Sequence, residues 1–289
     1  MAAVEGLGDG TLGVDGLPPP PQPRSGPDAA MTRMRRRSTA PHLKIGRGPT
    51  AFDAPLHLDW SMNKDEILAW LRKKGTESTV NGMARYGLEA KHAFGVPMGT
   101  LLTLAKRLGK DHALSLALWE TGWYEARLLA ALVGDPARVT RRQMDSWAAD
   151  FENWGDCDTV CFKLFDQTPL AWERARKWSA SPREYVKRGG FVLMACLAAH
   201  DKAALDQGFI AFLPLIEKGA DDERNFVKKG VSWALRMIGR RNLALNKAAL
   251  VVAKRLAASD EGAPRWVGQD ALRELSSPKV QAQLARRAK

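Results

Sequence analysis

The chain has 289 residues, of which 45% are hydrophobic, and it carries a formal net charge of +12 at pH 7. This apolar content excludes a wholly disordered chain, because it is enough for one large core or a stacked array of small ones. No apolar run approaches the roughly 20 residues that cross a bilayer, so we expect a soluble, cytoplasmic protein.

The basic balance favours a polyanionic partner, either nucleic acid or an anionic membrane surface. The three cysteines, Cys157, Cys161 and Cys196, are odd in number and lie in apolar helical segments. They therefore indicate reduced thiols rather than a disulfide framework. Cys157 and Cys161 are four residues apart, but no histidine stands near them at ligand spacing, so we expect no zinc site.

The first sixty residues are rich in Gly and Pro and show no sustained apolar periodicity. This composition predicts a disordered tail over residues 1–61. The segment holds seven basic and six acidic residues, so nearly all of the net charge belongs to the rest of the chain. Met31 and Met62 precede the folded region, and we hypothesise that part of the tail reflects an upstream start. An intact mass of the natural product that begins at Met1 would refute this.

From Asn63 onward, the sequence predicts short amphipathic helices separated by Gly, Pro and capping residues. Asn63 with Glu66 forms a capping-box pattern, and Ser181 followed by Pro182 marks a second helix start. No run of alternating residues is long enough for a sheet, so we expect an all-α fold. The expected helices cover residues 63–73, 77–85, 98–108, 111–120, 123–133, 141–151, a segment opened by Asn153, 170–179, a segment opened by Ser181, 203–217, 222–239, 243–257, 264–275 and 278–287.

These helices are short and are paired across tight turns, at intervals of roughly 35 to 45 residues, a spacing typical of repeat proteins. The pattern indicates an α-solenoid of the HEAT-like repeat type over residues 62–289. Such stacks curve and present a concave face. Lined with Lys and Arg, that face would form a basic groove that could follow a duplex backbone.

The helix opened by Asn153 carries the strongest site pattern. Asn153 is expected as the N-cap, with the Asp156 carboxylate serving the first-turn amides. Trp154 and Asp158, four residues apart, share one side of the helix at the border of its apolar stripe. We therefore expect an aromatic face and an unpaired carboxylate at the edge of the core, where a binding or catalytic group would stand. The stripe comprises Cys157, Val160, Cys161 and Leu164.

Two later helices carry cations at defined positions. The helix that starts near Pro182 is apolar from Gly189 to Ala199, so it is expected to be internal, with Arg188 emerging where the helix meets solvent. Arg183 and Lys187 lie at the same end. In the helix around Trp233, the residues Val227, Val231, Ala234 and Ile238 form a buried stripe, while Lys229, Trp233, Arg236 and Arg240 follow one another along another side.

Each of these residues also has a plainer interpretation. Taken alone, Trp154 and Trp233 are typical core residues, and Asp158 is typical of a carboxylate paired with a basic neighbour. The remaining tryptophans are expected in core or inter-repeat packing. They include Trp70, Trp119, Trp147, Trp172, Trp178 and Trp266.

Taken together and in order, these motifs resemble the AlkD-like family of DNA alkylation repair glycosylases. The resemblance rests on Trp154 with Asp158, on the Lys187-Arg188 pair that opens an apolar helix, and on the stretch 225–233. It covers the chain from Met62 to the C-terminus. Two earlier stretches that contribute are Trp119-Glu120-Thr121-Gly122 and Glu125-Ala126-Arg127-Leu128-Leu129-Ala130.

The resemblance implies a HEAT-like repeat fold that holds duplex DNA. It also implies base excision repair by hydrolysis of the N-glycosidic bond of positively charged N-alkylated purines, such as 3-methyladenine and 7-methylguanine, without base flipping. By match of motif, Asp158 takes the place of the catalytic carboxylate, Trp154 and Trp233 of the lesion-flanking aromatics, and Arg188 of a DNA-contacting arginine. Lys187 is the alternative for that cation. We further predict DNA contacts from Lys187, Arg183, Lys229, Arg236 and Arg240.

The implied chemistry is physically consistent. A cationic purine leaves without a general acid, so the enzyme has to stabilise the cation that develops on the sugar and to position a water molecule, which a carboxylate can do. Indole faces attract cations. No lysine nucleophile is indicated, so we expect a monofunctional glycosylase, active as a monomer, with no cofactor and no metal ion, on duplex DNA and on no membrane.

Two other functions remain open at this point. One is a non-catalytic HEAT-like scaffold that binds unusual DNA structures or a protein partner, for which salt-dependent DNA binding without base release would be the sign. The other is a solenoid that binds only proteins, which would show no affinity for duplex DNA.

Overall fold

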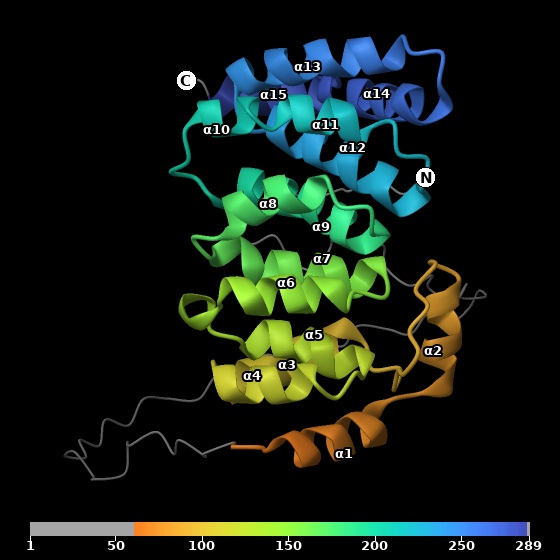
Figure 1. The fold of residues 1–289 in the computed structure, drawn as a ribbon, viewed down its shortest axis with the longest axis vertical. Coiled ribbons are helices and arrows are strands. Elements are labelled where there is room, and N and C mark those ends of the chain that lie inside the picture. Colours follow the sequence, from red (N-terminus) through yellow and green to blue (C-terminus); the bar gives the residue numbers. More distant parts are fainter. Residues whose placement is uncertain (1–60, 288–289) are drawn as a thin grey trace, which may run out of the picture. The chain divides into compact units, whose positions relative to one another are not determined.

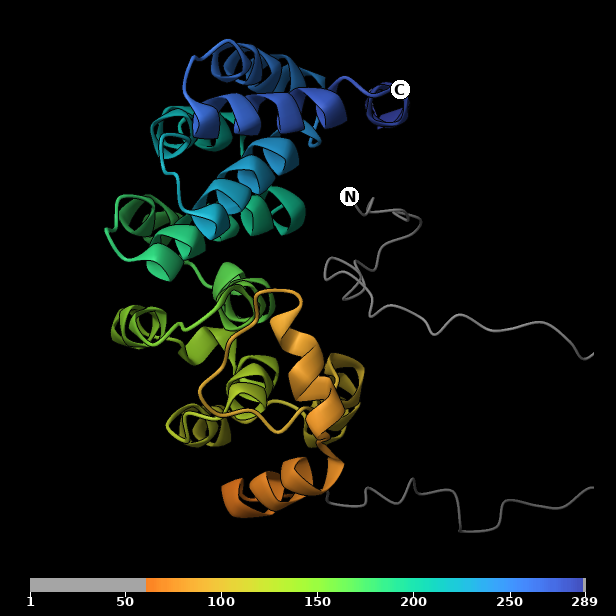
Figure 2. The ribbon, with the colours of Figure 1, turned by 90° about the vertical axis from the view of Figure 1, so that its right-hand side faces the viewer.

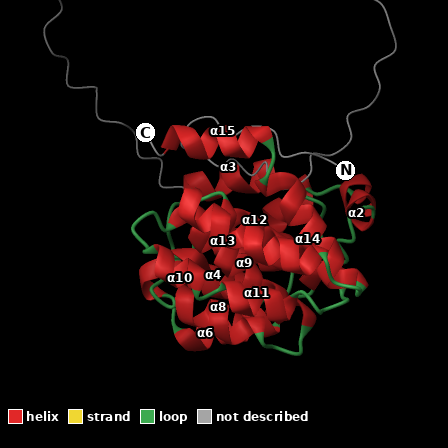
Figure 3. Cartoon of the chain, turned by 90° about the horizontal axis from the view of Figure 1, so that it is seen from above, coloured by secondary structure: helices red, strands yellow, loops and turns green. Residues whose placement is uncertain are grey.

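The structure, a computed structural model, describes residues 61–287, and the tail predicted over residues 1–61 lies almost wholly outside that part. The described residues form α-helices and two short 3₁₀ helices and no strand (Figure 3). The predicted all-α class is confirmed. The elements are α1 (Lys64–Lys74), α2 (Glu77–Ala84), α3 (Met98–Leu108), α4 (His112–Trp119), α5 (Tyr124–Val133), η1 (Pro136–Arg138), α6 (Arg141–Ala149), α7 (Trp154–Lys163), η2 (Phe165–Gln167), α8 (Ala171–Ser179), α9 (Glu184–His200), α10 (Asp206–Ile210), α11 (Leu213–Gly219), α12 (Asn225–Gly239), α13 (Leu243–Ala257), α14 (Gly262–Leu275) and α15 (Pro278–Arg287).

The helices stack in chain order, as Figure 1 shows. One row is formed by α5, α7, α9, α12 and α14, each in contact with the next. A second set, α4, α8, α11 and α13, packs against members of that row as the first helix of each pair. This repetition of paired helices is the HEAT-like arrangement that the sequence predicts. The basic groove stays a prediction. No helix among the described residues is long and apolar enough to span a bilayer.

The internal position of α9 follows from its sequence. Every residue from Arg188 to Ala199 is buried, as the apolar run predicts. Gly190 permits the close approach of α8, because a Cβ there would lie 2.3 Å from the backbone nitrogen of Ser179. On the other side, a Cβ on Gly189 would lie 3.5 Å from Cys157 Sγ on α7. Gly190 therefore lets α9 pack tightly against α8, whereas Gly189 faces α7 at an ordinary van der Waals distance.

Most of the tryptophans have the packing role expected of them. Trp119 and Trp147 are buried and stack with ring centroids 4.0 Å apart, and Trp178 is buried as well. Trp70 and Trp172 are partly buried against the same core. Trp266 differs, because it is 38% exposed on α14 with Lys228 Nζ 5.4 Å from its ring.

Two predicted helix boundaries are wrong for local reasons. The segment 203–217 is not one helix, since α10 ends at Ile210 and α11 begins at Leu213. Pro214 explains the break, because its ring would clash with the carbonyl four residues earlier. The start at Ser181 is also misplaced: α9 begins at Glu184, and the Ser181 hydroxyl accepts a hydrogen bond from the Arg183 amide in the preceding turn.

Candidate active site

The first turn of α7 forms as its sequence predicts. The Asn153 side chain accepts hydrogen bonds from the amides of Gly155 and Asp156, at 2.8 and 3.2 Å. The buried Asp156 carboxylate accepts a hydrogen bond from the Asn153 amide at 3.3 Å and another from the Cys157 amide at 2.6 Å. Burial raises the pKa of Asp156 to about 7, although these backbone donors oppose the shift. These hydrogen bonds give Asp156 the structural role expected of it. The apolar stripe of α7, which contains Cys157, is fully buried.

The centre of the candidate site is an ion pair between α7 and α9. Arg188 Nε donates to Asp158 Oδ1 at 2.8 Å, and Nη2 donates to Oδ2 at 2.6 Å. The side chains are 14% exposed for Asp158 and 7% exposed for Arg188. Burial lowers the pKa of the Arg188 guanidinium, but the neighbouring Asp158 raises it, and the net direction is upward.

This geometry corrects two expectations. Asp158 is not unpaired, and Arg188 does not emerge into solvent but turns inward toward α7. The physical reason is that a charged group at the edge of a core is expensive to desolvate unless an opposite charge and hydrogen bonds compensate it. The plainer interpretation of Asp158, as a carboxylate paired with a basic neighbour, therefore describes its contacts correctly.

Arg188 also reaches the third helix of the site. Its Nη1 donates to the carbonyl oxygen of Phe226, in the first turn of α12, at 2.6 Å. Gly230, one turn later, faces this side chain, and a Cβ there would lie 3.4 Å from Arg188 Cγ, an ordinary contact distance. One guanidinium thus joins α7, α9 and α12.

Trp154 lies at the start of α7 and is partly buried. Its indole Nε1 donates to the carbonyl oxygen of Tyr86, at 3.0 Å, in the turn that follows α2. The neighbouring Asn153 donates to the carbonyl of Glu89 in the same segment, at 3.3 Å. Figure 2 shows α2 running across the layers of helices rather than within one of them. The indole nitrogen of Trp154 is therefore used for structure.

The same turn contacts α12 as well. Gly87 has a φ of +65°, and a Cβ on it would lie 2.9 Å from Phe226 Cζ. Leu88 approaches α7, since a Cβ on Gly155 would lie 2.7 Å from Leu88 Cδ2. Residues 86–89, which we call the α2 turn, therefore cover the first turns of both α7 and α12. This contact could not be predicted from the sequence, because α2 has no buried residue and the partners of the α2 turn lie more than 60 positions away.

On α12, the predicted apolar stripe is confirmed, with all four of its residues buried. Trp233 is partly buried on another side, about two turns beyond Phe226. Lys229 is exposed, and its Nζ lies 5.8 Å from the Phe226 ring. Trp154, Asp158, Arg188 and Trp233 thus lie on three helices that are neighbours in one row.

The predicted DNA-binding cations have protein partners in this structure. Arg236 and Arg240 bind the Glu274 carboxylate on α14, at 2.5 and 3.1 Å. Lys187 bonds to the buried Asp222 carboxylate at 2.8 Å, and Arg183 donates to the carbonyl of Ala149. Their part in DNA binding stays a prediction. The row of cations on α12 is in part neutralised by α14, which sequence spacing alone did not reveal.

Asp222 is a site neighbour that the sequence reasoning missed. Besides Lys187, it binds Arg224 through both oxygens, at 2.8 and 2.6 Å. The Arg224 guanidinium holds the pKa of this carboxyl well below its usual value; burial opposes the shift, and Lys187 reinforces it. The available signal in the sequence was the position of Asp222 just before a helix rich in cations.

Among residues 61–287, no three His, Cys, Asp or Glu side chains gather so that they could hold a metal ion.

Comparison with known proteins agrees with the fold and the motifs. Residues 67–275 match the family described as DNA alkylation repair enzyme. A solved structure described as belonging to a new family of proteins related to the HEAT-like repeat DNA glycosylases, with affinity for branched DNA structures, superposes with a TM-score of 0.63. That match has 20% sequence identity and covers 77% of this chain and 96% of the other. No curated protein matches the chain. The chain belongs to the DNA alkylation repair enzyme family, with a HEAT-like repeat fold.

Proposed function

We propose that this protein is a monofunctional DNA glycosylase that releases positively charged N-alkylated purines, such as 3-methyladenine and 7-methylguanine, from duplex DNA without flipping the base. The observation that carries the proposal is the Asp158 carboxylate at the edge of the core, held in one orientation by Arg188. The family match supports DNA repair in general. The choice of reaction rests on the chemistry of this carboxylate.

Asp158 is suited to a reaction that needs no acid. The base is already cationic, so it leaves without protonation, and positive charge develops on the deoxyribose. A fixed carboxylate stabilises that charge without reorganising during the reaction. Arg188 uses one lone pair on each Asp158 oxygen, which leaves a second lone pair on each to accept a hydrogen bond from the attacking water.

Arg188 acts in this proposal as a positioning residue. Its three hydrogen bonds fix the plane of the Asp158 carboxylate relative to α12. Lys187, the alternative cation, is turned toward Asp222 instead. The geometry therefore favours Arg188 over Lys187 as the residue that controls the carboxylate.

Trp154 on α7 and Trp233 on α12 supply indole faces on the two helices that flank α9 in the row. A cation near an indole face is stabilised by roughly 0.5 to 2 kcal/mol, so two such rings favour the charged transition state over the neutral ground state. Because the Trp154 nitrogen is bonded to Tyr86, its ring is held in place. Selectivity for damaged purines would then come from charge rather than from contacts to the edges of the base.

The test is incubation of the purified full chain with methylated duplex DNA, followed by chromatography of the released bases. We expect wild type to release 3-methyladenine and 7-methylguanine without cutting the strand, and Asp158→Asn to be slower by about 100- to 1000-fold, the usual effect of losing one electrostatic contact. Unchanged release by this variant would refute the mechanism.

A matched control separates catalysis from stability. Asp145 binds the buried Arg174 at 2.6 Å on α6 and α8, outside the candidate site. Asp145→Asn breaks a comparable ion pair, so it is expected to lower the melting temperature yet leave base release unchanged at temperatures where the variant is folded.

We also propose that the protein is a monomer. Gel filtration with light scattering would test this.

A second function has its own support. The solved structure with the same fold belongs to proteins described as having affinity for branched DNA structures. In this chain the ion pair with Arg188 offsets part of the negative charge that Asp158 would present to a sugar cation. A non-catalytic protein that binds branched DNA is therefore the alternative. Tighter binding to a four-way junction than to a duplex, with no base released from methylated DNA, would establish it.

A further inference from the structure

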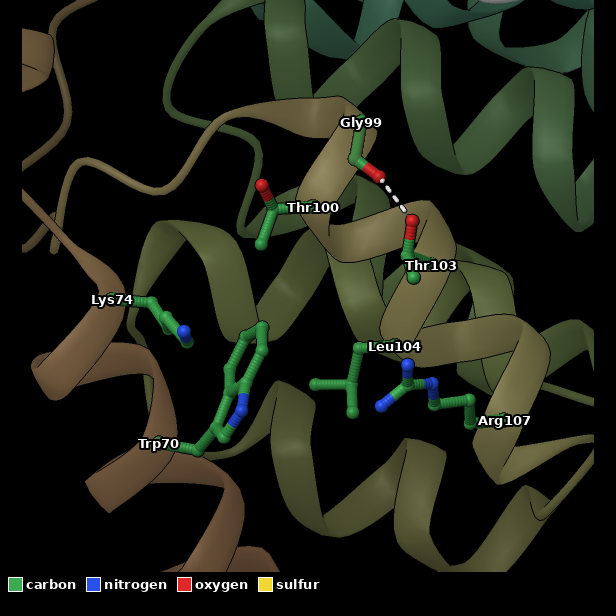
Figure 4. A pocket seen from close by; sticks show the side chains of 7 residues that line it. All are labelled: Trp70, Lys74, Gly99, Thr100, Thr103, Leu104 and Arg107. Carbon is green, nitrogen blue, oxygen red and sulfur yellow. Dashed lines mark hydrogen bonds between the residues drawn. The ribbon is translucent and has the colours of Figure 1, made fainter.

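A cavity lies far along the chain from Asp158, between α1 and α3. Its volume is about 610 Å³, within the range of about 300 to 1000 Å³ that is usual for small-ligand sites. None of the residues that line it belongs to the candidate active site (Figure 4). The side chains relevant here are Trp70, Lys74, Thr100, Thr103, Leu104 and Arg107.

One part of the wall is apolar. Trp70 is partly buried and packs against the core, and Leu104 is buried on α3. Figure 4 shows the two side chains next to each other at one side of the cavity. An indole at the wall of an open cavity offers a stacking surface for a nucleobase, and such stacking tolerates any base because every base has a π-face.

The rest of the wall is positive or hydrogen bonding. Lys74 ends α1, Arg107 lies in the last turn of α3, and in Figure 4 their charged groups point inward from opposite sides. Thr103 donates its hydroxyl to the Gly99 carbonyl at 3.0 Å, which leaves the hydroxyl oxygen able to accept a hydrogen bond. Two cations on opposite sides match a phosphate that enters between them.

We propose that this cavity binds one unpaired nucleotide of a DNA strand, with the base against Trp70 and Leu104 and a phosphate between Lys74 and Arg107. The volume suits one nucleotide, whereas a base that is paired and stacked within a duplex cannot present its face to Trp70. The proposal goes beyond the glycosylase function, since it concerns single-stranded segments next to a duplex and requires no damaged base.

The test compares undamaged DNA substrates by fluorescence anisotropy with the full chain. One substrate is a blunt duplex, and the other is the same duplex with a five-nucleotide single-stranded extension. We expect the extension to improve affinity by about tenfold, the effect of stacking one base. In the double variant Lys74→Ala/Arg107→Ala, this preference is expected to disappear.

The matched control uses the adjacent cations. Lys73 and Lys106 are exposed in the same two helix turns but do not line the cavity. The double variant Lys73→Ala/Lys106→Ala removes the same charge, so it is expected to weaken binding to both substrates alike and to keep the preference for the extension. Trp70→Phe, which retains an aromatic ring, is expected to keep most of the preference, and Trp70→Leu to lose it, with melting temperatures measured for both.

Three results would overturn the proposal. They are equal affinity of wild type for the two substrates, the same loss of preference in the Lys73/Lys106 variant, or competition by free dTMP without any preference for the extension, which would indicate a free nucleotide instead. Because no base release is measured, failure here is separate from failure of the glycosylase proposal.

Discussion

The Arg188 guanidinium donates one hydrogen bond to each carboxylate oxygen of Asp158, at 2.8 and 2.6 Å. This contact joins residues 30 positions apart and determines the orientation of the Asp158 carboxylate. Removing one partner of a buried ion pair costs about 3 to 5 kcal/mol, so stability and activity have to be measured together in each variant.

The first prediction concerns Arg188→Lys. Lysine keeps the charge but cannot bind both oxygens and the Phe226 carbonyl at the same time, so Asp158 loses its fixed orientation. We expect base release to fall by about 10- to 100-fold, because a misplacement of a reacting group by about 1 Å can cost about 100-fold in rate. Single-turnover release from methylated duplex measures this.

Arg174→Lys is the control for that variant. Arg174 is buried and paired with Asp145 outside the candidate site. We expect a similar drop in melting temperature and no change in base release. An equal loss of release in both variants would indicate that Arg188 acts only through stability.

The second prediction concerns the two indoles of the candidate site. Trp154→Phe and Trp233→Phe each weaken the attraction of a ring for a cation, so we expect release to slow by about 3- to 30-fold. Trp154→Phe also loses the bond to Tyr86, which is expected to reduce stability by about 1 kcal/mol. Trp172 lies on α8 and donates a comparable bond to Asp201, which follows α9, so Trp172→Phe is the control and should leave release intact.

The third prediction concerns the α2 turn. Gly87 and Gly122 have nearly the same φ, +65° and +71°, but only Gly87 faces a side chain, that of Phe226. Gly87→Ala should therefore lose more stability than Gly122→Ala, which has only the backbone strain of about 1 kcal/mol. Chemical denaturation compares them. Only Gly87→Ala is expected to slow base release, because Phe226 carries the carbonyl that Arg188 binds.

The fourth prediction concerns acid stability. The folded-state pKa of Asp222 is depressed by Arg224, with burial in opposition and Lys187 in support. The contribution of the ionised Asp222 carboxylate to the free energy of unfolding is thus fully present above the unfolded-state pKa of about 4. It is lost progressively as the pH falls below that value. We expect the melting temperature of Asp222→Asn to fall less between about pH 5 and about pH 3 than that of wild type. Parallel curves would contradict this, and Asp65→Asn, at an exposed carboxylate, should follow wild type.

Local sequence was sufficient for the features that depend on neighbouring residues. The capping boxes at Asn63 and Asn153 and the buried stripe of α12 follow from spacing within one helix, and the structure contains them. The break before Pro214 was also readable from local chemistry, although the sequence analysis placed one helix there. In each case the decisive interaction spans fewer than ten residues.

Contacts between distant segments were not predictable in the same way. The inward turn of Arg188 depends on how closely α9 approaches α7, and the bond from Trp154 to Tyr86 depends on α2 crossing the stack. The pairing of Arg236 with Glu274 needs α14 beside α12. Helical periodicity gives the face on which a residue lies, but not the partner that the fold brings to that face.

The three hydrogen bonds of Arg188, to Asp158 and to the Phe226 carbonyl, determine when the candidate site is assembled. Since a single side chain links α7, α9 and α12, the carboxylate and the helices that bear both indoles are set in register when the protein folds, before a ligand arrives. Catalytic groups that are preorganised in this way lose little free energy to rearrangement during the reaction. In the proposed reaction, a lesion would therefore meet groups whose relative positions are already set.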